Sequence, residues 1–294
     1  MTKIPKIAFI GLGIMGEPMA KNMIAKGFDV AVCDVSTTAL QNFDDLNCTR
    51  SSDPGEAAAG RDVIITMLAT SDIVSDVLFG ENGALHSAAP DSLVIEMSTG
   101  SYPQFMDIAK AVHESSHRII DAPVGRSPRE AVSGNLLVMA GGANDDVSNS
   151  MPIFEAVGDT IIHVGPLGDG LKTKLVNNYM SMVNHVLTGE VLAFAHKIDL
   201  DVNTTVEVLS TTSAGRGQLL TNFPKKVLAG DTTPDFPIWM GIKDLRMALE
   251  LADLGECEGK FGKLSRDLFI AAEEKGMGKL DCTAILNFLK DHKI

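Results

Sequence analysis

The stretch that decides the fold joins an apolar run to a glycine-rich loop: Ile7-Ala8-Phe9-Ile10-Gly11-Leu12-Gly13-Ile14-Met15-Gly16. The apolar run predicts a buried strand, and the helical pattern after the loop, which ends near Gly27, predicts a helix. GxGxxG in this position, at the end of a strand and the start of a helix, is typical of a loop that binds the pyrophosphate of a dinucleotide.

Each position of this loop has a physical role in such a site. Gly11 permits the tight turn, Gly13 lets the backbone approach the pyrophosphate, and Gly16 lets the helix pack closely on the strand. The N–H groups of Ile14 and Met15 lie at the positive end of the helix dipole, so we expect them to face the anion. The alternative is a glycine turn between strand and helix that binds nothing.

The next apolar run, Val30 to Cys33, ends at Asp34, 18 residues after Gly16. A carboxylate in this place accepts hydrogen bonds from the ribose hydroxyls and repels a 2′-phosphate, so the sequence predicts NAD in preference to NADP. Asp34 could equally be an ordinary turn residue at the end of a strand.

Further apolar runs at 63–68, 93–97 and 119–120 alternate with helical patterns, and 135–142 can add another strand. This rhythm predicts βαβ units, and hence an α/β Rossmann domain with a mostly parallel, doubly wound sheet. Ligands of such sheets bind at the carboxyl ends of the strands. We therefore expect Leu68 and Ser98-Thr99 to line the same crevice as the glycine loop.

Beyond residue 170 the strand-like runs stop and the periodicity is helical to the end of the chain. We predict a Rossmann domain over residues 1–165 and an all-α domain over 166–294. The glycines between 165 and 170 mark the boundary, and a long helix over about 170–197 would bridge the two domains.

Composition excludes several classes of function. The formal net charge of −13 argues against a nucleic-acid partner, because that binding needs a basic face. The four cysteines form no CxxC pair and the seven histidines no ligand-spaced cluster, so we expect neither disulfides nor a metal site. No apolar stretch is long enough to span a membrane, and we expect a cytoplasmic protein.

Polar side chains occupy one face of the predicted bridging helix: Lys174, Asn178 and Ser181 stand at i, i+4 and i+7. Hydride transfer to a carbonyl builds negative charge on its oxygen, which a nearby lysine can neutralise and protonate. Lys174 is therefore the acid/base candidate. We expect partial burial, Lys172 and Lys243 to lower its pKa. The alternative is a solvated lysine in the first turn of a surface helix.

Taken together, the motifs resemble those of the β-hydroxyacid dehydrogenase family over essentially the whole chain. The matching segments are 11–22, Met97-Ser98-Thr99, Asp121-Ala122-Pro123-Val124, 170–178 and Lys243-Asp244-Leu245. The resemblance implies a soluble NAD-dependent dehydrogenase with Lys174 as the catalytic lysine and Asn178 orienting the substrate. It also implies that Thr99 and Lys243 lie beside the nicotinamide and the substrate. Without the resemblance, Lys243-Asp244 would be an exposed pair of neighbouring charges.

One loop departs from the common family pattern. After Asp121-Ala122-Pro123-Val124 the family has Ser-Gly-Gly, whereas this chain has Gly125-Arg126-Ser127-Pro128. A guanidinium offers five donors in a fixed fork, which suits an anion with several oxygens, such as a sulfonate. The alternative is a surface arginine paired with Glu130 at i+4.

The Gly125-Arg126 pair and the segment from Asn177 to Ser181 resemble a branch of the family that reduces 3-sulfolactaldehyde to 2,3-dihydroxypropane-1-sulfonate. That resemblance places the sulfonate against Arg126, Ser127, Asn178 and Ser181, with Asn177 in the same segment. The loop of that branch continues Gly-Arg-Thr-Ser, so Pro128 removes one hydroxyl. We therefore expect a small anionic aldehyde or hydroxyacid as substrate.

Other readings stay open at this point. Because one arginine also binds a carboxylate, the chain could reduce a carboxylate semialdehyde such as succinate, tartronate or methylmalonate semialdehyde. A non-catalytic dinucleotide-binding protein is a second alternative, and the combination of Lys174, Asn178 and Lys243 argues against it. An imine reductase shares the architecture that the resemblance implies, but such enzymes usually lack a lysine at the position of Lys174. The resemblance also implies a homodimer or homotetramer.

Overall fold

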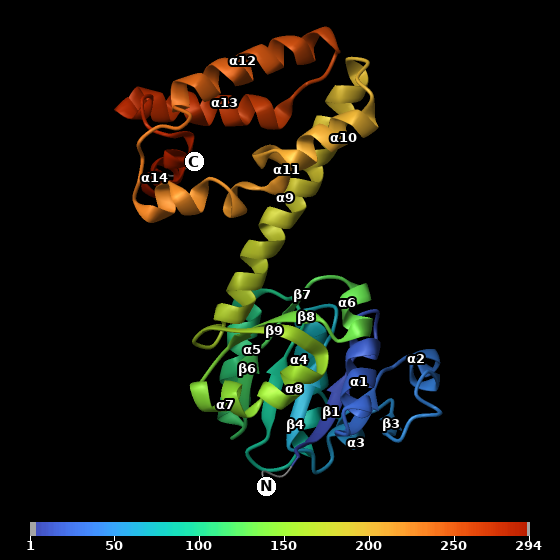
Figure 1. The fold of residues 1–294 in the computed structure, drawn as a ribbon. Helices are drawn as coiled ribbons and strands as arrows, with labels where there is room; N and C mark the ends of the chain where they lie inside the picture. The colour runs from blue at the N-terminus through green and yellow to red at the C-terminus, as the bar shows by residue number, and fades with distance from the viewer. Residues whose placement is uncertain (1–3, 293–294) are drawn as a thin grey trace. The chain divides into compact units, whose positions relative to one another are not determined.

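A computed structural model describes residues 4–292 of the 294 in the chain. Its contacts divide the chain into two units, one ending at Tyr179 and the other beginning at Met180. The first unit contains a nine-stranded sheet in the order β3-β2-β1-β4-β5-β6-β8-β7, with β9 also paired to β8 (Figure 1). The strands are β1 Lys6–Ile10, β2 Asp29–Cys33, β3 Thr49–Ser51, β4 Val63–Thr66, β5 Leu93–Glu96, β6 Arg118–Asp121, β7 Val124–Gly125, β8 Leu136–Gly141 and β9 Gly158–Gly165.

The pairing from β3 to β6 is parallel throughout, and the strand order reverses at the contact of β1 with β4. This arrangement confirms the predicted doubly wound α/β fold. β8 pairs antiparallel with β6 and β7 and parallel with β9. The apolar runs did not predict β3, β7 or β9. β3 is short and largely exposed, β7 has two residues, and most of β9 is only partly buried, so none carries a clear apolar signal.

Helices cover both faces of this sheet because alternate residues of each strand point to opposite faces. Ile7 and Phe9 pack into a buried cluster with α1 and α8, whereas Ala8 and Ile10 belong to a second cluster with α3, α4 and α5. The helices of this unit are α1 Gly16–Ala25, α2 Thr37–Gln41, α3 Pro54–Ala58, α4 Ser71–Phe79, α5 Tyr102–Glu114, α6 Pro128–Ser133, α7 Asn144–Asn149 and α8 Met151–Val157.

The long helix α9 spans Asp169–Lys197. We predicted a helix over about 170–197 and a domain boundary in the loop before it. The contacts divide the chain inside α9, after Tyr179. The first turn of α9 thus groups with the sheet, where Leu171 is buried in the cluster that contains α5.

The second unit is helical, as predicted. Among its described residues there is no strand, only an isolated bridge between Pro237 and Asp281. Its helices are α10 Val202–Thr211, α11 Ser213–Arg216, α12 Ile238–Leu254, α13 Lys260–Ala272 and α14 Ile285–Asp291, with shorter helical turns between them.

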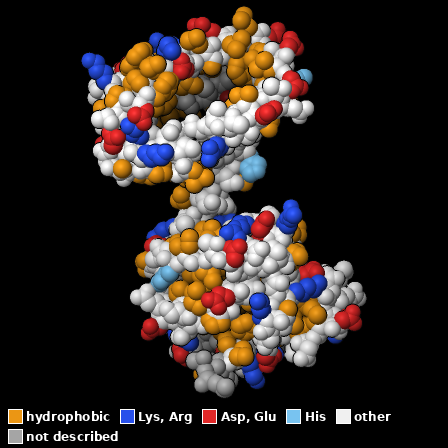
Figure 2. Space-filling model, viewed as in Figure 1, with side chains coloured by type: hydrophobic (Ala, Val, Ile, Leu, Met, Phe, Trp, Pro, Cys, Tyr) orange, Lys and Arg blue, Asp and Glu red, His pale blue; other side chains and the backbone are white. Residues whose placement is uncertain are grey.

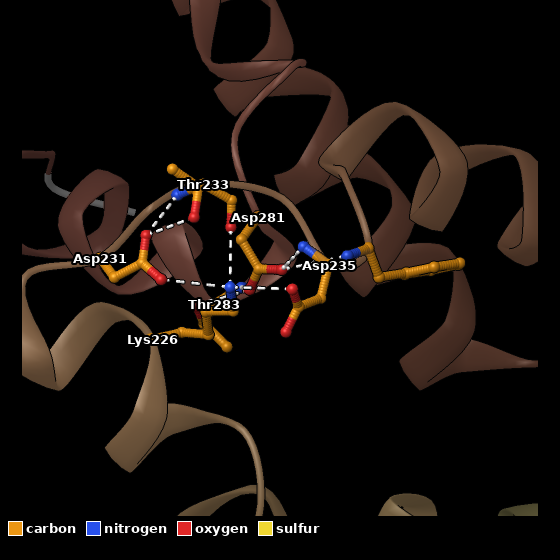
Figure 3. Close-up of polar contacts among 7 residues, drawn as sticks. Lys226, Asp231, Thr233, Asp235, Asp281 and Thr283 are labelled. Atoms are coloured by element: carbon orange, nitrogen blue, oxygen red, sulfur yellow. Dashed lines mark hydrogen bonds and ion pairs between the residues drawn. The ribbon is translucent and has the colours of Figure 1, made fainter.

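A polar network in this unit holds the loop before α12 (Figure 3). Buried Asp281 accepts hydrogen bonds from the N–H groups of Asp235 and Phe236 and from the N–H and hydroxyl of Thr283. Lys226 pairs with Asp235 at 2.9 Å and with Asp231 at 3.2 Å. These bonds join the segment before α12 to Asp281 and Thr283, next to the buried side chain of Ile238 at the start of α12.

The buried apolar cluster of the second unit is small: Ile238, Ile242, Ala272 and Phe288. Large apolar side chains instead lie exposed, and Figure 2 shows them in patches around a hollow in this unit. They include Met182, Val186, Leu220, Trp239, Met247 and Leu254. In the described part of the chain, no helix is long and apolar enough to cross a membrane.

Candidate active site

Two glycines of the loop after β1 are required by packing. Gly11 has φ +102°, and a Cβ on it would collide with the carbonyl oxygen of Met67. A Cβ on Gly16 would collide with the carbonyl oxygen of Gly11. These close approaches hold the turn against β4 and bring α1 onto the end of β1, as the sequence predicted for a GxGxxG loop.

Gly13 differs, because no described atom lies within 4 Å of the place its Cβ would occupy. Packing of the chain therefore does not require glycine there, whereas a ligand lying against the backbone would. At the adjacent start of α1, the N-cap residue Met15 makes no side-chain capping hydrogen bond, and the helix dipole favours an anion. The loop thus fits the pyrophosphate of a dinucleotide, with Ile14 and Met15 at its N-terminal turn.

Asp34 follows β2 and is joined to the glycine loop. Its Oδ2 accepts a hydrogen bond from the N–H of Leu12 at 2.7 Å, and its Oδ1 accepts one from the N–H of Ser36 at 2.8 Å. The carboxylate is partly exposed. Asp34 is therefore a turn residue, and lone pairs remain on both oxygens for a ribose.

The ends of β4 and β5 meet beside this loop. The N–H of Leu68 donates to Ser98 Oγ at 2.8 Å, which ties the two turns together. Leu68 is partly buried, and Thr99 is exposed directly after Ser98. The parallel order of the sheet thus brings Gly11, Asp34, Leu68 and Thr99 to one edge.

Beneath that edge lies a buried carboxyl group that the sequence did not single out. Glu96, the last residue of β5, accepts hydrogen bonds from the N–H of Ser98 at 2.9 Å and from the hydroxyl of Thr66. Burial raises the pKa of Glu96 to about 7 despite these bonds, which lower it. A strand-end glutamate among apolar residues gives no such signal in the sequence, because its burial and its bond to Thr66 of β4 depend on the packing of the sheet.

Lys174 lies in the second turn of α9 and is half-buried. Burial lowers the pKa of its amine, as expected, and no ion pair to Lys174 is found within residues 4–292. Lys172 is different: hydrogen bonds with Asp169 and Tyr102 raise its pKa. Burial is the cause of the shift of Lys174, and the expected contribution of Lys172 is not found. The contribution of Lys243, which belongs to the second unit, stays a prediction.

Asn178 follows Lys174 by one helical turn, and the amide of Asn177 donates to Asn178 Oδ1 at 3.3 Å. Ser181 continues along α9 in the second unit. Lys243 lies in α12 of the second unit, where its Nζ is 3.0 Å from Asp244 Oδ1 and its side chain is half-exposed. Lys243 and Asp244 therefore form the pair of neighbouring charges that the sequence offered as the alternative.

The alternative pairing of Arg126 with Glu130 was wrong. Glu130 and Ser127 form the capping box of α6, in which Pro128 occupies the first turn. Glu130 instead accepts hydrogen bonds from both the N–H and the hydroxyl of Ser127. Pro128, which stands where the loop of the resembled branch has a hydroxyl, thus occupies the first turn of α6.

Arg126 instead reaches across to β9. Its guanidinium donates to Asp159 Oδ1 at 2.6 Å, to Thr160 Oγ1 at 3.0 Å and to the carbonyl oxygen of Asn135. The backbone of Arg126 is left-handed, with φ +76°. No hydrogen bond or ion pair between described residues joins this loop to Lys174. The sequence missed Asp159 and Thr160 because they lie 33 and 34 residues away.

Over the described residues, no group of His, Cys, Asp and Glu side chains could hold a metal ion. What the first unit offers is a glycine loop with an uncapped helix, a carboxylate beside it, and a half-buried lysine. These are the parts of a dinucleotide-dependent oxidoreductase site.

Comparisons with known proteins identify the family of this chain. Residues 6–165 match the NAD binding domain of 6-phosphogluconate dehydrogenase. Residues 168–289 match the family described as NAD-binding of NADP-dependent 3-hydroxyisobutyrate dehydrogenase. The chain belongs to the 3-hydroxyisobutyrate dehydrogenase family of NAD(P)-dependent hydroxyacid dehydrogenases and reductases, and the predicted resemblance is confirmed.

Within that family, the chain is 39% identical to the 3-sulfolactaldehyde reductase of Escherichia coli K12, over 95% of this chain and 94% of that protein. It is 29% identical to human mitochondrial 3-hydroxyisobutyrate dehydrogenase, over 98% and 87% of the two chains.

Among solved structures, a Mycobacterium tuberculosis 3-hydroxyisobutyrate dehydrogenase with L-serine matches with a TM-score of 0.68 and 26% identity, over 98% of this chain and all of that one. An imine reductase from Myxococcus stipitatus in complex with NADP+ matches with a TM-score of 0.87. At 15% identity, over 97% of this chain and all of that one, it shares the fold alone.

The different environments of Lys172 and Lys174 yield a test within one molecule. We expect the amine of Lys174 to become reactive at lower pH than that of Lys172, because burial lowers one pKa and hydrogen bonds raise the other. Acylation with trace acetic anhydride across a pH series, followed by mass spectrometry, measures the pH at which each amine is half as reactive as at high pH. We call this pH the midpoint of that lysine. Equal midpoints would show that Lys174 is an ordinary solvated lysine.

Proposed function

We propose that this chain reduces 3-sulfolactaldehyde to 2,3-dihydroxypropane-1-sulfonate with NADH. The main support is the 39% identity to 3-sulfolactaldehyde reductase over nearly the full length of both chains. Arg126, which replaces a small residue of the common family loop, supports a substrate whose anionic group has several oxygens.

In this reaction the nicotinamide supplies a hydride to the aldehyde carbon. Lys174 donates a proton to the aldehyde oxygen as the carbonyl becomes a hydroxyl, and accepts it in the reverse direction. The lowered pKa of its amine suits this exchange, because an acid works best when its pKa is near the working pH. Asn178, one turn further on α9, orients the same oxygen by hydrogen bonding.

Arg126 recognises the sulfonate in this proposal, and Ser127, Asn177, Asn178 and Ser181 supply further polar contacts. Its guanidinium is shared with Asp159 and Thr160, on the exposed face of the loop. A guanidinium has five donors, so it can bind an anion while it keeps part of this pairing. Exposed ion pairs are weak because water competes for both charges, so the substrate can displace Asp159.

Thr99 and Lys243 complete the proposed site beside the nicotinamide and the substrate. Asp34, partly exposed and joined to the glycine loop, accepts hydrogen bonds from the adenosine ribose and disfavours a 2′-phosphate. This is the basis of the proposed preference for NADH over NADPH.

A carboxylate semialdehyde is the second candidate substrate. The observation that favours it is the similarity to 3-hydroxyisobutyrate dehydrogenases, at 29% identity to the human enzyme. An arginine can hold a carboxylate through two parallel hydrogen bonds, so Arg126 alone does not separate the two classes.

The substrate class is tested by NADH oxidation with 3-sulfolactaldehyde and with succinate semialdehyde. We expect kcat/KM to be about a hundredfold higher for the sulfonate. Arg126→Ala should raise KM for the sulfonate about tenfold or more and change kcat little, because it removes a binding contact. Arg129→Ala, which removes an exposed arginine from α6, is the matched control. Equal kcat/KM values would assign the chain to the carboxylate semialdehyde reductases.

Cofactor choice is tested with Asp34→Ala. The ratio of kcat/KM for NADH to that for NADPH should fall about tenfold or more, because the variant loses both the ribose acceptor and the repulsion of a 2′-phosphate. Asp45→Ala, at an exposed position after α2, controls for loss of one negative charge. A ratio that stays the same in Asp34→Ala would remove the ribose role.

We also propose that the chain forms a homodimer or homotetramer through its second unit. Many large apolar side chains of this unit are exposed, among them Val186, Leu220 and Leu254, whereas its buried apolar cluster is small. Contiguous exposed apolar surface of this kind marks an interface.

The other partners that we propose are small molecules, and we propose a cytoplasmic location.

Sedimentation equilibrium over a range of concentrations tests self-association. We expect a mass two or four times the 31.3 kDa of one chain, because the apolar patches stay exposed in a monomer. A single species of one-chain mass at micromolar concentration would contradict the proposal.

A further inference from the structure

Asp121 is a buried carboxylate that the proposed reaction does not use. It is the last residue of β6, it is 1% exposed, and it lies beside Glu96 of β5 and Gly141 of β8 in the strand registers. The chain continues from it directly into the loop that carries Arg126. A charge buried this deeply needs partners that compensate for lost water.

Its partners are backbone N–H groups at the start of α9. The N–H of Gly168 donates to Asp121 Oδ1 and the N–H of Leu171 donates to Oδ2, both at 2.7 Å. Helix N-termini carry unpaired N–H groups and a partial positive charge, which a side chain near in sequence usually satisfies. Here the cap comes from a residue 47 and 50 positions earlier. Burial raises the pKa of Asp121, and these two hydrogen bonds oppose that shift.

Two glycines close the space around this carboxylate. A Cβ on Gly141 would lie 2.7 Å from Asp121 Oδ1 and 2.7 Å from the backbone nitrogen of Gly170. A Cβ on Gly170 would collide with the carbonyl oxygen of Met139 and lie 2.8 Å from Asp121 Oδ2. The first turn of α9 therefore packs backbone against backbone on β8, with the carboxylate between them.

We propose that Asp121 is a positioning residue, which fixes the first turn of α9, and with it Lys174, at the carboxyl ends of β5 and β6. Lys174 follows Leu171 by three residues on the same rigid helix, so a displaced first turn displaces the amine. The inference rests on the proposed function, in which Lys174 exchanges the proton. A shift of about 1 Å at such a group can cost about a hundredfold in rate.

Asp121→Asn is the sharpest test, because it keeps the shape but places an amide donor against one of the two N–H groups. We expect kcat to fall about tenfold or more, while the Kd for NADH, measured by fluorescence titration, stays within about twofold. Asp169→Asn is the matched control: it removes a carboxylate from the same turn of α9, one that binds Lys172 and no backbone N–H. Its kcat should stay within about twofold of the wild type.

Acylation of Lys174 and Lys172 gives a readout that does not depend on activity. Loss of a neighbouring negative charge alone would lower the pKa of an amine. If the first turn of α9 moves and Lys174 becomes solvated, its midpoint should rise toward that of Lys172. A rise in Asp121→Asn and none in Asp169→Asn therefore reports displacement of the helix.

Gly170→Ala serves if Asp121→Asn does not fold. Alanine favours a helix more than glycine does, but its Cβ forces the first turn of α9 away from Asp121 and β8. We expect the same fall in kcat with NADH binding retained, and the same rise in the Lys174 midpoint. A folded variant of either kind with wild-type kcat and an unshifted Lys174 midpoint would overturn the proposal.

The two proposals fail in different ways. Activity is measured with whichever aldehyde the wild type reduces faster, so a wrong substrate class does not affect the test. If Lys174→Ala keeps its turnover, the acid/base assignment fails. The Lys174 midpoint in Asp121→Asn still reports whether the carboxylate positions α9.

Discussion

The parallel pairing of β1 with β2 on one side and β4 on the other is the constraint on which the first unit depends. The registers set Ile10 beside Cys33 and Thr66, so the three strands end level. Gly11 then donates to the carbonyl oxygen of Cys33, and Met67 donates to that of Ile10. Because parallel strands end at the same edge, polar residues that follow different strands come together there although they are far apart in sequence.

The cations of the proposed site lie in contrasting environments, and these differences suit different tasks. Arg126 is paired with Asp159 on an exposed face, Lys243 with Asp244, and Lys174 is half-buried and makes no ion pair in the part of the chain that is described. A paired, exposed guanidinium stays charged and can exchange one anion for another. A partly desolvated amine gives up its proton more readily, which proton exchange with a substrate requires.

The fold by itself does not specify this chemistry. The imine reductase structure superposes with a TM-score of 0.87 at 15% identity, whereas the 3-hydroxyisobutyrate dehydrogenase superposes with 0.68 at 26%. An imine reductase and a 3-hydroxyisobutyrate dehydrogenase thus share the fold of this chain. Function has to be argued from the side chains of the site, and here that means Lys174, Asn178 and the Arg126 loop.

The sequence by itself determined the features that depend on local spacing: the glycine loop, the strands with long apolar runs, the helical second unit, and Lys174, Asn178 and Ser181 on one helix. Only the tertiary structure decided which distant groups meet. Arg126 pairs with Asp159 across 33 residues rather than with Glu130 one turn away, and Asp121 caps a helix 47 residues later. The burial that lowers the pKa of Lys174 is likewise tertiary. A periodic pattern fixes neighbours along a strand or helix, but long-range partners depend on how the elements pack, which no local spacing encodes.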